Sequence, residues 1–170
     1  LGFALIKLNK NEEAITTFNK IIQFKPDYAL AYHNLGIIES KLDRYESAIL
    51  NFKKTIELSN TFFEVYGNLG NLLSVAGEFE LAIIYYKKMI ELQPDFAKAY
   101  DNIGNALVEL GQFNNATKCF ESAIVLEPDL LEARYNLGLL MHTIGKYEKA
   151  IQYFDSIDFR YSKYYLLKCL

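Results

Sequence analysis

Four asparagines recur at one spacing, and their side chains are the groups of this chain best suited to binding chemistry. They lie 34 residues apart, at Asn34, Asn68, Asn102 and Asn136. Asparagine is a mediocre helix former, so its recurrence inside stretches of helical periodicity calls for a reason. A carboxamide offers one acceptor and two donors, the set needed to hold the N–H and C=O groups of an extended peptide. The alternative is that these amides only hydrogen-bond neighbouring helices.

The whole chain repeats at the same spacing. Glycine recurs at positions 2, 36, 70, 104 and 138, and alanine at positions 14, 48, 82, 116 and 150. A fixed period of this length is the signature of a solenoid, in which each unit packs only on its neighbours. Full units are expected at 29–62, 63–96, 97–130 and 131–164, with 1–28 as a partial unit and 165–170 as the start of a further helix. No insertion breaks this frame, so we predict a single array without a linker.

Each unit is predicted to form a helical hairpin. It holds two apolar-periodic stretches of about 13 residues, too long for typical strands. The residues between the two stretches tolerate the left-handed conformation that ends a helix; they are Asn9, Asp43, Gly77, Gly111 and Gly145. After the second stretch, proline at 26, 94 and 128 ends the helix and the following aspartate is expected to cap the next one. A glycine such as Gly104 is expected where the two helices cross closely, with the recurring alanine facing it.

The pattern resembles the tetratricopeptide repeat (TPR) over the whole chain. One unit carries the motif as Tyr66, Leu69, Gly70, Ala82, Tyr86 and Pro94, and two others carry most of it. Departures are local. Tyrosine replaces the initial tryptophan in three units and Arg134 replaces it in a fourth, Asn60 stands where proline is usual, and the last full unit has no proline. The end of that unit's second helix is therefore undefined. The resemblance implies an all-α, right-handed superhelical solenoid of antiparallel helix pairs.

One stripe of each first helix cannot lie in the core of its own unit. The second, sixth, ninth and thirteenth places of that helix point away from the side that packs on the second helix. In a stack of hairpins this stripe faces the inner, concave side. We therefore take the stripe and the neighbouring fifth places as candidate peptide-binding residues: Asn34, Glu64, Asn68, Asn71, Lys98, Asp101, Asn102, Asn105, Tyr135 and Asn136.

Two comparisons within the family refine this interpretation. We call the four sixth-place asparagines (Asn34, Asn68, Asn102 and Asn136) the asparagine ladder. This ladder is similar to the one lining the TPR superhelix of O-linked N-acetylglucosamine transferase, which implies a substrate-holding scaffold and no transferase chemistry. TPR domains that clamp a chaperone's C-terminal carboxylate carry lysine at the fifth place of a unit. The fifth places here are His33, Gly67, Asp101 and Tyr135, so that ligand is disfavoured.

Other chemistry is missing from the sequence. No residues form a catalytic constellation, so we expect neither an enzyme activity nor a cofactor. His33 and His142 lie three units apart, too far to share a metal ion, and are expected to face the groove as polar contacts. The net charge is −3, and acidic and basic residues are interspersed. The sequence therefore lacks the clustered positive charge expected of a nucleic-acid binder. No run of 18 apolar residues predicts a membrane span. Two distant cysteines favour a reducing, cytoplasmic setting.

Three functional hypotheses remain open. The first is a protein-interaction scaffold that binds an extended peptide or a partner helix in its concave groove. The second is the substrate-recruiting arm of a larger enzyme whose catalytic domain lies outside this sequence. The third is a structural module that self-associates through apolar faces at Leu1 and Leu170, since the sequence starts and stops within the pattern. Sequence beyond Leu170 would separate the first two, and the oligomeric state would test the third.

Overall fold

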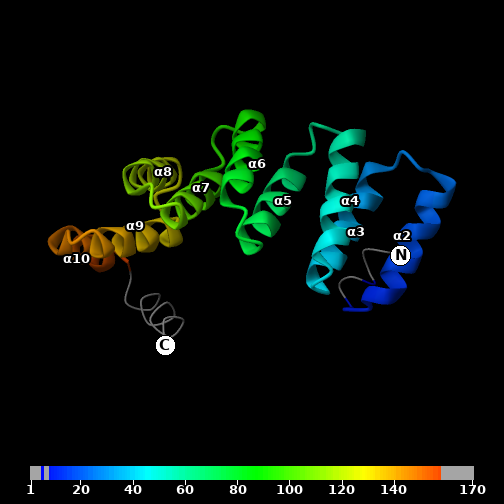
Figure 1. Ribbon diagram of the computed structural model, residues 1–170, viewed down its shortest axis with the longest axis horizontal. Coiled ribbons are helices and arrows are strands. Elements are labelled where there is room, and N and C mark those ends of the chain that lie inside the picture. The colour runs from blue at the N-terminus through cyan, green and yellow to red at the C-terminus, as the bar shows by residue number, and fades with distance from the viewer. Residues whose placement is uncertain (1–4, 6–7, 158–170) are drawn as a thin grey trace. The chain divides into compact units, whose positions relative to one another are not determined.

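The computed structural model describes residues 5 and 8–157, and the regular structure there is entirely α-helical (Figure 1). The helices are α2 (Asn11–Phe24), α3 (Ala29–Lys41), α4 (Tyr45–Leu58), α5 (Phe63–Val75), α6 (Phe79–Leu92), α7 (Ala97–Glu109), α8 (Phe113–Leu126), α9 (Leu131–Thr143) and α10 (Tyr147–Asp155). The predicted all-α repeat fold is confirmed. The expected end faces at Leu1 and Leu170 and the helix start over 165–170 lie outside the described residues.

The chain divides into two compact units. The N-terminal unit extends to Glu78 and contains α2 to α5, and the C-terminal unit begins at Phe79 and contains α6 to α10. In the N-terminal unit α3 packs on α4, and in the C-terminal unit α7 packs on α8 and α9 on α10. The first helices of successive repeats also touch, α3 with α5 and α7 with α9. Side chains of adjacent repeats can therefore meet directly on these helices.

The turns between paired helices follow the sequence prediction. The five residues expected in the left-handed conformation all have positive φ: 57° at Asn9, 56° at Asp43, 79° at Gly77, 69° at Gly111 and 77° at Gly145. The next residue's backbone N–H then reaches back into the last turn, as from Arg44 to the Glu39 carbonyl at 2.9 Å. This bond satisfies a carbonyl that the helix end leaves unpaired.

The predicted aspartate caps are wrong. The cap positions of α3, α7 and α9 are Tyr28, Phe96 and Leu130, one residue beyond the aspartates, and none makes a side-chain cap hydrogen bond. Tyr28 and Leu130 instead pack against buried apolar clusters. Burial of an apolar side chain therefore decides which residue occupies the cap position, and the aspartate falls just outside the helix.

The predicted close crossing at the repeat glycines is confirmed, but the predicted facing residue is wrong. A Cβ built on Gly36 would lie 2.5 Å from the ring of Phe52, and one on Gly104 would lie 2.5 Å from Phe120. The facing group is thus the aromatic ring four residues beyond the alanine. The larger side chain, one helical turn further along the same face, reaches the glycine first.

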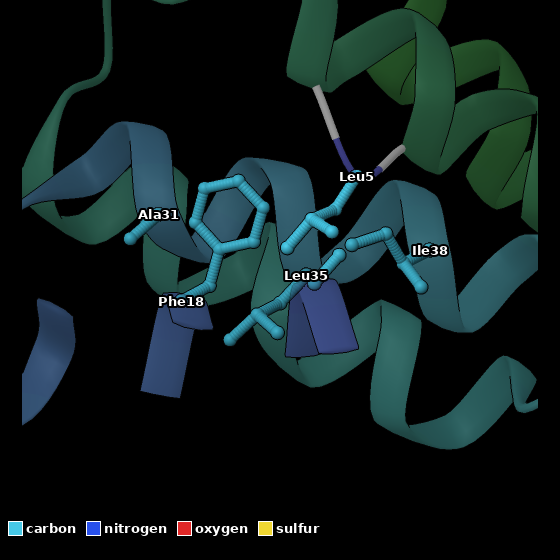
Figure 2. Packing of buried hydrophobic residues seen from close by; sticks show 6 residues of the cluster. Leu5, Phe18, Ala31, Leu35 and Ile38 are labelled. Atoms are coloured by element: carbon cyan, nitrogen blue, oxygen red, sulfur yellow. The ribbon is translucent and has the colours of Figure 1, made fainter. Parts of the chain in front are cut away.

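The apolar core of the N-terminal unit joins neighbouring helices. Phe18 of α2 belongs to one buried cluster with Ala31, Leu35 and Ile38 of α3, which Leu5 and Ala14 complete (Figure 2). This packing fixes the rotation of α3, and hence the direction of its remaining faces. No helix in the described part of the chain is long and apolar enough to cross a membrane.

Candidate functional site

Two of the predicted ladder residues belong to the N-terminal unit, and both bind to the protein itself. Asn34 is 4% exposed, and its Nδ2 donates to the Leu30 carbonyl of its own helix at 2.6 Å. On α5, Nδ2 of Asn68 lies 2.9 Å from Nε2 of His33 on α3. Because an amide N–H can only donate, His33 accepts through Nε2 and carries its proton on Nδ1. This hydrogen bond ties adjacent repeats together.

His33 is buried, in contrast to its expected position as a groove contact. It is 7% exposed, and the centroid of its ring lies 4.5 Å from the ring centroid of Phe62 and 5.9 Å from that of Phe52. Burial lowers the pKa of His33 from its ordinary value, and the charge of Glu64 opposes that effect only in part. The ring is therefore neutral near pH 7, as the hydrogen bond with Asn68 requires.

The stability of the fold should depend on pH through His33. The ordinary pKa of an unfolded histidine is about 6.5, and burial lowers the pKa of His33 in the fold. The contribution of the neutral ring is therefore complete above pH 6.5 and is lost as the pH falls through the folded pKa. We expect the melting temperature of the wild type to fall more, between about pH 7.5 and pH 5.5, than that of His33→Gln.

Glutamine keeps an acceptor for Asn68 but does not titrate. The exposed His142 provides the matched control, and His142→Gln should keep the pH dependence of the wild type. Equal losses of melting temperature for the wild type and His33→Gln would show that His33 is not the titrating group.

In the C-terminal unit, the equivalent contact is ionic. The carboxylate of Asp101 is fully buried and accepts from Nδ2 of Asn136 at 2.8 Å, while Nζ of Lys98 lies 3.0 Å from its other oxygen. Lys98 also pairs with Glu132 of the next repeat. Burial alone would lower the pKa of Lys98, but its bonds to Glu132 and Asp101 and their charges raise it. This network holds α7 against α9.

Two of these contacts share a pattern that the sequence reasoning missed. A polar residue at the fifth place of one repeat bonds the sixth-place asparagine of the next, 35 residues on, as in His33 with Asn68 and Asp101 with Asn136. The feature of the sequence that could have predicted these contacts was a titratable residue at the fifth place of a repeat. For Asn68 and Asn136, the alternative of hydrogen bonding between neighbouring helices is therefore part of their role. Peptide contact by the ladder remains a prediction.

The inner stripe of the N-terminal unit lines a pocket of about 330 Å³. Its walls come from α3, α4 and α5, and they are formed by Ile37, Ser40, Lys41, Tyr45, Phe52, Asn68, Asn71, Leu72 and Val75. Five of these are stripe positions: Ile37, Lys41, Asn68, Asn71 and Val75. Val75 is 71% exposed despite its apolar side chain. We call this hollow the inner pocket.

The remaining candidates are spread along first helices. Glu64 is exposed one turn before Asn68 on α5. In the C-terminal unit Asn105 is exposed, whereas Asn102 and Tyr135 are half-buried. The ring of Tyr135 lies 5.8 Å from that of Phe154. Within the described residues, no three histidine, cysteine or acidic side chains gather as a metal site would require.

Comparison with known proteins places the chain in a family. A TPR repeat model matches residues 2–43 and 104–145, and two tetratricopeptide repeat models match 29–62 and 63–96. No curated protein matches the sequence. Similar solved structures share the fold at low sequence identity.

A crystal structure of MamA is 24% identical, with 92% of this chain and 91% of that chain covered and a TM-score of 0.85. YrrB, described as a TPR protein with an unusual peptide-binding site, is 23% identical, with 91% and 80% covered and a TM-score of 0.77. Pseudomonas aeruginosa PilF is 20% identical, with 92% and 71% covered and a TM-score of 0.82. The repeat models together match well over half of the sequence, so the chain belongs to the tetratricopeptide repeat family.

Proposed function

We propose that this chain is a protein-interaction module that holds an extended peptide or a helix of a partner protein on the inner face of its first helices. The observation that carries the proposal is the inner pocket, whose lining combines the amides of Asn68 and Asn71 with the apolar side chains of Ile37 and Val75. Extended peptides are recognised through main-chain hydrogen bonds for affinity and side-chain pockets for specificity. The inner pocket offers groups for both.

The fixed position of Asn68 favours binding. Its amide is already held by His33 on the neighbouring helix, so a ligand need not immobilise it. Immobilising a side chain rich in rotamers costs about 0.5–1.5 kcal/mol on association. The hydrogen bond between Asn68 and His33 thus orders one wall of the inner pocket before a peptide binds.

Family membership supports the same function. TPR domains generally bind proteins or peptides, and the description of YrrB includes a peptide-binding site. The likeness of the asparagine ladder to that of O-linked N-acetylglucosamine transferase points the same way. We propose binding without catalysis, cofactor or nucleic acid. A role as the recruiting arm of a larger enzyme would use the same surface.

Removal of one inner-face amide should weaken peptide binding. The probe is a fluorescein-labelled peptide selected from a random dodecapeptide display library against the immobilised chain, and affinity is measured by anisotropy. Asn71→Ala should weaken binding about fivefold, because one hydrogen bond contributes roughly 1 kcal/mol.

Asn19→Ala is the matched control, since Asn19 is an exposed asparagine of α2 away from the inner pocket. It should bind like the wild type. Unchanged affinity in Asn71→Ala, or equal losses in both variants, would place the peptide elsewhere on the molecule.

A further inference from the structure

We infer that the inner pocket selects peptides in which a large apolar side chain stands close to an acidic one. This inference rests on the proposed function and names the ligand chemistry of the same surface. It is carried by the make-up of the pocket walls and by the ion pairs around them.

The apolar part of the pocket fits a side chain. Ile37, Phe52, Leu72 and Val75 contribute apolar walls. The volume of about 330 Å³ lies at the small end of ligand pockets, so it suits one or two side chains. Covering Val75, which is 71% exposed, removes apolar surface from water and so favours a partner of the same character.

The charge of the pocket is positive. Lys41 is the single charged residue among its walls, and it is exposed. Within the described residues Lys41 forms no ion pair, and three acidic groups of α2, α3 and the α3–α4 turn bond other residues. Tyr45 donates to Asp43 at 2.8 Å, and Arg44 bonds both Glu39 and Glu12. An incoming carboxylate would therefore meet a cation that forms no ion pair within the described residues.

The repeat pattern does not require a lysine at the thirteenth place, which Lys41 occupies. The thirteenth places of the following repeats hold Val75, Glu109 and Thr143, so the positive charge belongs to one repeat. In the C-terminal unit, Lys98 is already paired with Asp101 and Glu132 and offers no comparable partner for an acidic ligand. Complementary charge acts mainly on specificity and encounter, so we assign the acidic preference to the inner pocket.

Display of random dodecapeptides tests the inference. Panning on the wild type should enrich sequences that place Leu, Ile, Met or Phe beside Asp or Glu. Panning on Lys41→Glu should abolish the acidic preference, and Lys41→Arg should keep it. Lys53→Glu changes another exposed lysine, on α4, and should leave the preference unchanged.

Binding measurements with one selected peptide separate the two halves of the motif. Changing its acidic residue to the corresponding amide should weaken binding about fivefold to the wild type and little to Lys41→Gln. Val75→Ser should weaken binding, whereas Leu50→Ser, at a residue exposed to 69% on α4, should not.

The outcomes distinguish this inference from the proposed function. Enriched peptides without the apolar–acidic pattern, or a pattern unchanged in Lys41→Glu, would overturn the inference and leave peptide binding intact. Failure to enrich any peptide would overturn both.

Discussion

Gly104→Leu is expected to lower the free energy of unfolding by about 3 kcal/mol, the upper end of the usual range for overpacking a core. A Cβ alone at this position would lie 2.5 Å from the ring of Phe120. That ring is fully buried, and because protein interiors are close-packed, it can move only by displacing its neighbours. The leucine must therefore separate α7 from α8 or force the ring from its preferred rotamer. Urea denaturation followed by circular dichroism measures the loss.

Two controls identify the crossing as the cause. Lys118→Leu changes an exposed residue of α8 and should cost no more than about 0.5 kcal/mol. Phe120→Leu replaces the facing ring with a smaller side chain, so it should offset part of the cost of Gly104→Leu. The losses of unfolding free energy in the double variant should therefore be non-additive. Equal losses for Gly104→Leu and Lys118→Leu would contradict the observed crossing.

Lys98→Met should cost about 2–3 kcal/mol, because it leaves the buried carboxylate of Asp101 with Asn136 as its remaining partner. Breaking a fully buried pair typically costs about 3–5 kcal/mol. The effect here should be smaller, since Lys98 is 38% exposed and water can replace part of the interaction. Methionine retains most of the aliphatic length, so the loss reports on the charge.

Lys88→Met is the matched control in the same unit. Lys88 pairs with Glu91 at the same helical spacing, but the two side chains are 53% and 60% exposed. Exposed pairs contribute about 0–1 kcal/mol. If thermal or urea denaturation gave equal losses for the two variants, the Lys98–Asp101 contact would be no more than a surface pair.

The parts of the fold that the sequence predicted are those in which one local rule repeats. Asn9, Asp43 and the turn glycines have positive φ because few other residues adopt that conformation at low cost. The glycine at each helix crossing was identified for a similar reason, because repetition at one place exposes a close approach. The facing ring was not identified, because a helical wheel gives the direction of a side chain and not its reach.

The candidate site was less predictable, because its contacts join different repeats. The asparagine positions were visible, but the wheel of a single helix does not show how α3 meets α5 or α7 meets α9. The bonds from Asn68 to His33 and from Asn136 to Asp101 depend on that approach. The burial of His33 and Asp101 follows from the same contacts. The hydrogen bond between His33 and Asn68 joins neutral groups, whereas the one between Asp101 and Asn136 involves a carboxylate.

The central claim, that peptide binds the inner face of the first helices, is tested most directly by NMR. The isotopically labelled chain is titrated with a peptide selected from the display library, and amide shifts are mapped onto the structure. The largest shifts are expected at inner-pocket residues of α3 and α5, including Ile37, Lys41, Asn71 and Val75. Shifts confined to outward-facing residues of α4 and α8, such as Leu50 and Lys118, would contradict the account.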